Sequence, residues 1–85
     1  MKLTAELSLY PLNEQYIPVI DDFLHDLRKR AELTIITNAM STQICGDYDA
    51  VFTAVHEVLR DSCERHGKQV LVCKFIPGQA LLAAT

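Results

Sequence analysis

The segment from Thr37 to Val51, TNAMSTQICGDYDAV, carries a dense group of side chains that can form hydrogen bonds. Amides, hydroxyls and carboxylates follow one another there, and the segment contains no lysine or arginine. Connections in short domains are usually trimmed to a few residues. Two interpretations of this polar segment are therefore open. It forms a hairpin whose second strand shows a polar face, or it lines a pocket.

The sequence holds no set of residues typical of catalysis or metal binding. No nucleophile is followed by a base and an orienting group, and the three histidines lack a partner at ligand spacing. Cys45, Cys63 and Cys73 form no Cys-x-x-Cys pair and cannot all pair within one chain, which suits a reducing cytosol. We therefore expect a non-enzymatic cytoplasmic protein without a metal or cofactor.

Length and charge narrow the class further. Eighty-five residues suffice for one domain, residues 1–85, and a domain this small often gains buried surface by oligomerisation. The net charge of −3 argues against nucleic acid, which requires a basic patch. The start of the chain lacks the apolar core of a signal peptide, and the apolar run ALLAAT is too short to span a bilayer. We expect no contact with a membrane.

Hydrophobic periodicity predicts six elements. Period-two alternation predicts strands, and apolar residues three or four apart predict helices. The expected strands cover residues 2–10, 33–38, 40–45 and 69–75. The first helix is expected over residues 16–31, with the apolar stripe Ile17, Ile20, Phe23, Leu24 and Leu27.

The second helix is expected to follow Asp47 or Asp49, either of which can cap its first turn. Its apolar stripe comprises Val51, Val55, Val58 and Leu59, and Gly67 is a typical stop. Gly46 just before it predicts a backbone requirement, either a positive φ angle or a β-bulge.

The resulting order βαββαβ predicts the α+β, ferredoxin-like sandwich, a four-stranded antiparallel sheet with two helices on one face. Right-handed crossovers place the first and third strands in the centre. The other face then combines polar and aliphatic side chains. They are expected to be Thr4, Glu6, Ser8 and Tyr10, then Ser41, Gln43 and Cys45, and finally Val70, Val72 and Lys74. Such a mixture favours a subunit interface or the floor of a ligand site.

The stretches AELSLYPL, TNAMSTQICGDYDAVFTAV and VCKFIPG resemble the YkoF-like family of thiamine- and hydroxymethylpyrimidine-binding proteins. The resemblance covers almost the whole chain, and its most specific part is the central MST-x-I-x-G-D-Y-D run. It implies a non-catalytic binding protein for thiamine or its pyrimidine precursor, in uptake or salvage. Because some members carry two such domains in tandem, a single copy is expected to form a homo-oligomer, a dimer or tetramer, through the open sheet face.

A ligand of this class needs acceptors for an exocyclic amine, hydroxyls or amides for ring nitrogens, and a soft surface for the ring. A carboxylate or an aromatic face could also stabilise a thiazolium cation, by roughly 0.5–2 kcal/mol. The resemblance and these needs together give the candidate ligand-binding residues Glu6, Ser8, Tyr10, Asn38, Met40, Ser41, Thr42, Gln43, Asp47 and Tyr48.

Several of these residues have a structural alternative. Asp47 can serve as the helix cap, Thr42 can pack under the second helix, and Glu6 can pair with Lys74 on the neighbouring strand. The sequence also allows an alternative function. The chain would then be a structural or regulatory domain that associates with itself through the open face and binds no small ligand.

Overall fold

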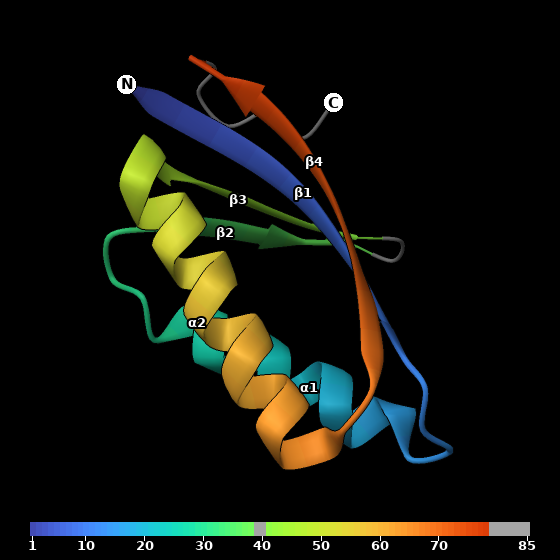
Figure 1. The fold of residues 1–85 in the computed structure, drawn as a ribbon. Coiled ribbons are helices and arrows are strands. Elements are labelled where there is room, and N and C mark those ends of the chain that lie inside the picture. Colours follow the sequence, from blue (N-terminus) through green and yellow to red (C-terminus); the bar gives the residue numbers. More distant parts are fainter. Residues whose placement is uncertain (39–40, 79–85) are drawn as a thin grey trace.

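The computed structural model describes residues 1–38 and 41–78 (Figure 1). Its elements are β1 (Lys2–Pro11), α1 (Tyr16–Arg28), β2 (Thr34–Thr37), β3 (Thr42–Asp47), α2 (Tyr48–His66) and β4 (Gln69–Pro77). The strands form one antiparallel sheet in the order β2-β3-β1-β4. Both helices lie on the same side of that sheet (Figure 1). The predicted ferredoxin-like fold, with the first and third strands central, is confirmed.

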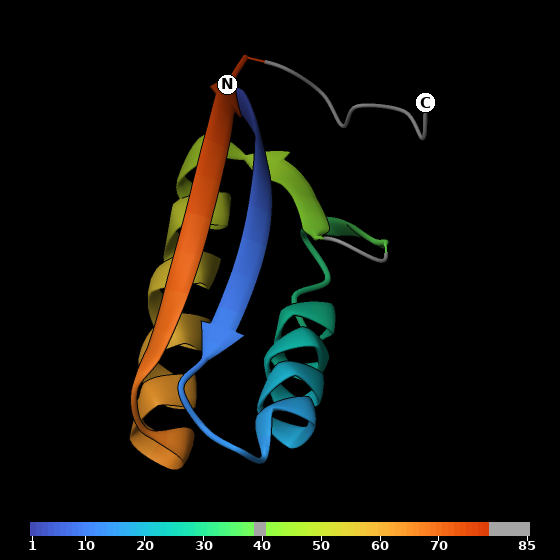
Figure 2. The same cartoon turned by 90° about the vertical axis from the view of Figure 1, so that its right-hand side faces the viewer.

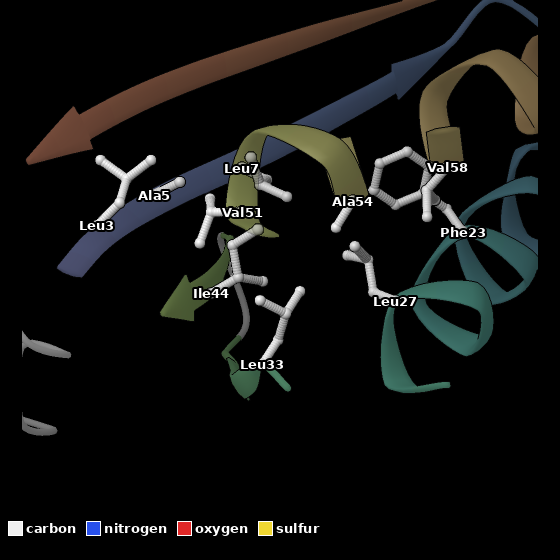
Figure 3. Close-up of a cluster of buried hydrophobic side chains, with 10 residues drawn as sticks. All are labelled: Leu3, Ala5, Leu7, Phe23, Leu27, Leu33, Ile44, Val51, Ala54 and Val58. Atoms are coloured by element: carbon white, nitrogen blue, oxygen red, sulfur yellow. The ribbon is translucent and has the colours of Figure 1, made fainter. Parts of the chain in front are cut away.

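The two faces of the sheet are set by the alternation along β1. Leu3, Ala5 and Leu7 are buried under the helices and belong to the main apolar cluster (Figure 3). The intervening residues Thr4, Glu6 and Ser8 therefore point to the face that no helix covers. Because cross-strand partners share a face, that open face also carries Gln43 and Cys45 of β3, Ile36 of β2, and Val70, Val72, Lys74 and Ile76 of β4.

Helix α1 contributes to the core at every fourth residue. Val19, Phe23 and Leu27 are buried, whereas Ile17 is 59% exposed, so its inclusion in the predicted stripe was wrong. The reason is angular, since Ile17 lies two residues before Val19 and therefore faces away from it on a helix. The side chain of Asn13 accepts a hydrogen bond from the Gln15 N–H at 2.8 Å and forms the turn that precedes the helix.

Helix α2 begins at Tyr48, and Asp47 occupies its N-cap position without a side-chain capping bond. Its carboxylate instead lies 3.4 Å from the ammonium group of Lys2 across the β1–β3 ladder. The carbonyl of Met1 accepts the Tyr48 N–H at 2.8 Å, which satisfies one donor of the first turn. Gly67 ends the helix with a φ of 84°, as expected for a C-terminal glycine.

Gly46 contradicts the sequence-based expectation. Its φ angle is not positive, and the β1–β3 register runs from Lys2–Asp47 to Leu7–Thr42 without an interruption, so there is no bulge. The requirement is one of space instead. A Cβ atom at residue 46 would lie 2.8 Å from Leu33 Cδ2 and 3.1 Å from the carbonyl oxygen of Glu32. The chain that leads into β2 packs directly on the backbone at this point.

Ion pairs join the outer surfaces of the helices. Arg65 and Lys29 both bind the Asp26 carboxylate, and the Arg30 guanidinium lies 2.5 Å from Glu57 Oε1. The hydrogen bond from Arg30, with its positive charge, holds the pKa of Glu57 below its ordinary value of 4.5.

This lowered pKa predicts a pH-dependent contribution to stability. A carboxyl group whose pKa is lower in the folded state stabilises the fold above its unfolded pKa, and this contribution is lost as the pH falls through the folded value. Arg30→Met should therefore unfold at lower urea concentration than the wild type at neutral pH, and the difference should shrink as the pH falls below 4.5. Lys68→Met, which removes another surface cation, is the control. A difference that stays constant with pH contradicts the assignment.

Candidate functional site

The predicted site residues do not form one cluster in the structure. Asn38, Ser41 and Thr42 line a cavity at one end of the sheet, whereas Glu6 and Gln43 lie on the open face. Ser8 shares the parity of Glu6 along β1 but also borders this cavity. Asp47 and Tyr48 are at the opposite end of β3, and Tyr10 is 56% exposed near the end of β1. Met40 lies outside the described residues.

The cavity lies where β1 continues past the start of β3 and α1 crosses beneath it. It has a volume of about 250 Å³. We call it the α1–hairpin cavity, and its lining comprises Leu7, Ser8, Leu9, Ile20, Phe23, Leu24, Thr37, Asn38, Ser41 and Thr42. Strand β1 and helix α1 supply the apolar walls, and the β2–β3 connection supplies the polar rim. The polar segment noted in the sequence therefore borders a pocket and also begins the second strand of a hairpin.

The hairpin that carries the rim is fixed by two hydrogen bonds between the same two residues. The Asn38 N–H donates to the Ser41 carbonyl at 2.9 Å, and the Ser41 N–H donates to Asn38 Oδ1 at 2.9 Å. The side-chain oxygen of Asn38 thus has a structural partner, and this residue shapes the rim. Neither of these two bonds uses the Ser41 hydroxyl.

Thr42 occupies the first position of β3 and is 6% exposed. It pairs with Leu7 on the helix side of the sheet, so the structural alternative was correct about its face. Its neighbours in the cavity belong to α1, however, and not to α2. Thr42 is therefore a largely buried polar residue at the edge of a cavity whose other walls are mostly apolar.

The electrostatics of the α1–hairpin cavity are neutral. Its described lining contains hydroxyls, one amide and aliphatic or aromatic groups, with no lysine, arginine, aspartate or glutamate. Burying an ion in such surroundings is costly, while a neutral polar ring is matched by hydroxyls at the rim. The cavity therefore suits an uncharged, flat group with a few hydrogen-bonding atoms.

A second, smaller depression lies on the open face. Its volume is about 150 Å³, and it is lined by Thr4, Glu6, Gln43, Lys74 and Ile76. Lys74 Nζ lies 3.8 Å from Glu6 Oε1, so the structural pairing of these two residues is confirmed. Gln43 Oε1 is buried and has no hydrogen-bond partner. A donor brought to this face by a ligand or another chain would satisfy it.

Sequence patterns did not predict the apolar lining. Ile20, Phe23 and Leu24 were assigned to the helix stripe, and Leu7 and Leu9 to the buried face of a strand. A residue that lines a cavity has the same periodicity as one that fills the core, so only the packing of the elements could separate them. Thr37 at the end of β2 was also missed, although it belongs to the same polar segment.

Other features of the described residues add no catalytic or metal site. No group of three or more histidine, cysteine, aspartate or glutamate side chains in residues 1–38 and 41–78 is arranged to hold a metal ion. Neither helix in this part of the chain is long and apolar enough to cross a membrane. The groove between α1 and α2 is lined mainly by charged residues, and Asp26 there pairs with both Lys29 and Arg65.

The sheet and the two helices define a ferredoxin-like domain, and the α1–hairpin cavity lies at one end of it. The YKOF-related family model matches residues 2–76, and the chain belongs to that family. No curated protein matches it in sequence.

Solved structures agree with the fold. A protein from Streptococcus pneumoniae is similar with a TM-score of 0.84 and 23% identity, over 93% of this chain and 89% of the other. One from Methanocaldococcus jannaschii has a TM-score of 0.79 and 25% identity, over 92% and 81%. A candidate thiamine biosynthesis or salvage protein from Thermotoga maritima has a TM-score of 0.83 and 16% identity, over 98% and 91%. These likenesses show that the chain shares its fold with the three proteins.

Proposed function

We propose that the chain is a non-catalytic cytoplasmic protein that binds thiamine or its hydroxymethylpyrimidine precursor, with the pyrimidine ring in the α1–hairpin cavity. The observation that carries this proposal is the joining of the polar central motif to an apolar pocket. Ser41 and Thr42 of that motif lie at the same cavity as Phe23 and Leu24 of α1. Family membership and the name of the Thermotoga neighbour support the choice of ligand.

The size and charge of the cavity favour one ring over the whole vitamin. Pockets for drug-sized ligands enclose roughly 300–1,000 Å³, and a cavity of about 250 Å³ is suited to a single substituted ring. The pyrimidine is neutral and matches the uncharged lining. The cationic thiazolium of intact thiamine would lie outside the rim, because no described lining residue carries a compensating charge.

The hydroxyls provide the contacts that orient the ring. Thr42 is the least exposed of the polar residues that line the cavity, so we assign its hydroxyl to a ring nitrogen or to the exocyclic amine of the ligand. Ser41 and Thr37 at the rim face the substituents that remain near solvent. The apolar groups of Leu9, Ile20 and Phe23 provide the surface against which the ring lies.

Calorimetric titration of hydroxymethylpyrimidine and of thiamine tests the proposal. The wild type should bind at about one ligand per chain, and Thr42→Val should weaken binding roughly twofold to tenfold, the effect of one hydrogen bond. Thr34→Val is the matched control, because Thr34 is an exposed strand residue on the other face of the sheet. Absence of saturable heat with both compounds overturns the proposal.

A specific observation also favours a second candidate function, self-association through the open face. That face carries the exposed side chains of Val70, Val72 and Ile76 beside the unpartnered Gln43 Oε1. Stacking of two such faces would bury the aliphatic groups and offer a donor to the amide. Native mass spectrometry reports it: Gln43→Leu should then change the oligomeric state and leave ligand affinity unaltered.

A further inference from the structure

In the part of the chain that the structure describes, no further strand pairs with the outer edge of β4, and β4 is longer than β2 at the other edge. Strand β2 has four residues, whereas β4 has nine and lies at the outer edge of the sheet (Figure 2). Its pairing with β1 continues from Leu3–Pro77 to Pro11–Gln69 without an interruption. Long regular edge strands are templates for further pairing, and proteins usually shorten, charge, twist or cover them.

Two hydrogen bonds show which backbone groups of β4 point away from β1. The Gly78 N–H donates to the Lys2 carbonyl at 2.7 Å, and the Leu12 N–H donates to the Lys68 carbonyl at 3.0 Å. Both bonds extend the β1–β4 register, so the even-numbered residues of β4 form the bonds to β1. The N–H and C=O groups of the odd-numbered residues Leu71, Cys73 and Phe75 therefore point away from the sheet.

The side chains along this edge are apolar on both faces. Val70, Val72 and Ile76 on the open face are 47%, 44% and 41% exposed. On the helix face Phe75 is 36% exposed, and its ring stacks on Phe52 of α2 with centroids 4.7 Å apart. One charged residue, Lys74, interrupts the strand. Apolar side chains beside unpaired backbone groups are the two components that a further strand would cover.

We propose that β4 pairs antiparallel with β4 of a second copy of this chain, on a two-fold axis that passes beside Cys73. Antiparallel pairing of a strand with itself is two-fold symmetric, so one number fixes the whole register. Centred on Cys73, the register places Val70 opposite the partner's Ile76 and Leu71 opposite the partner's Phe75. It also sets Val72 opposite the partner's Lys74. Each outward-pointing residue then meets another outward-pointing residue, as ladder bonds require.

Neighbouring registers fit less well. Centring the axis on Lys74 would place two ammonium groups directly opposite each other, which is unfavourable. Centring it on Val72 would pair Val72 with itself and Leu71 with Cys73, but it would set Lys74 opposite Val70 and Gln69 opposite Phe75. The two larger apolar pairs, Val70–Ile76 and Leu71–Phe75, would be lost. A shift of one strand by a single residue would place the outward-pointing N–H and C=O groups of one copy opposite residues of the other copy whose backbone groups point toward β1. The Cys73-centred register thus matches the exposed side chains best.

The charge of the residue at position 72 tests this register. Val72→Glu should place two glutamates opposite the partner's Lys74 residues, whereas Val72→Lys should place like charges there. The two variants share position, size and exposure. With two symmetric pairs, the dimer dissociation constant of the glutamate variant should be lower by about tenfold or more. Sedimentation equilibrium measures both constants.

Backbone amide exchange provides a readout that needs no substitution. In the wild type, the N–H groups of Leu71, Cys73 and Phe75 should become protected as protein concentration rises, because they enter the new ladder. The N–H groups of Val70 and Val72, which already bond to β1, serve as internal controls. A monomer at all concentrations, or equal weakening of association by both charged variants with unprotected odd-numbered amides, overturns the proposal. Equal weakening would be the result of stacking through the open face alone.

Discussion

Leu24→Trp should abolish detectable binding of hydroxymethylpyrimidine, with an affinity loss of at least about a hundredfold, or about 2.7 kcal/mol. Leu24 is half-buried on α1 and lines the α1–hairpin cavity together with Phe23. An indole at this position would occupy the space assigned to the ligand ring. The helix itself tolerates the change, because the side chain already reaches the surface. Calorimetric titration of the variant measures the loss.

The control for this variant is Leu12→Trp. Leu12 is 64% exposed, lies outside the helices and strands and does not line the cavity. The Leu12→Trp variant should therefore bind the ligand like the wild type. Both variants should give the same far-UV circular dichroism spectrum as each other. Undiminished affinity in a folded Leu24→Trp variant would place the ligand elsewhere, and the open-face depression beside Glu6 and Gln43 would be the next place to examine.

Gly46→Ala should destabilise the fold by about 1–3 kcal/mol, the usual effect of forcing extra volume into close packing. The new methyl group would contact Leu33 Cδ2 and the backbone oxygen of Glu32 at distances that real Cβ atoms avoid. The side chain of Leu33 can shift, but the Glu32 oxygen belongs to the backbone that leads into β2 and moves less easily. Urea unfolding of the two proteins measures the difference in free energy.

A double-mutant cycle with Leu33→Ala isolates the cause. Once the Leu33 side chain is shortened, the added methyl group meets one obstacle fewer, so Gly46→Ala should be less destabilising in that background. Equal effects in both backgrounds would assign the loss to the Glu32 carbonyl alone. No loss in either would mean that the chain leading into β2 adjusts freely, contrary to the packing described here.

The fold could be predicted from the sequence because local periodicity and topology agree. The alternation from Lys2 to Tyr10 gave the correct face for each residue, and both ends of α2 were located within about one residue. Errors arose where tertiary packing decides. Ile17 is as apolar as a core residue, but it lies in the first turn of α1 on the side that faces solvent. Gly46 is required because the segment before β2 packs against it, and no local sequence pattern reveals that contact.

The candidate site was predicted only in part, for a different physical reason. The polar half of the cavity was indicated by the Asn38–Thr42 segment, whose hydrogen-bonding groups exceed what a turn needs. Its apolar half could not be distinguished from core. Glu6 and Gln43 were placed on the correct face, but the sheet itself separates them from Thr42 because alternate residues of a strand point in opposite directions.

The central position of β1 determines when this protein can complete its sheet during synthesis. Strand β1 is synthesised before the other three strands, yet its neighbours in the sheet are β3 and β4. Its longer ladder is the one with β4, which runs from Leu3–Pro77 to Pro11–Gln69. A ribosome must therefore release nearly the whole described chain before β1 acquires its second partner. Until then the β1 edge is uncovered, and such edges attract other chains. The time between synthesis of β1 and of β4 therefore sets how long this edge stays exposed.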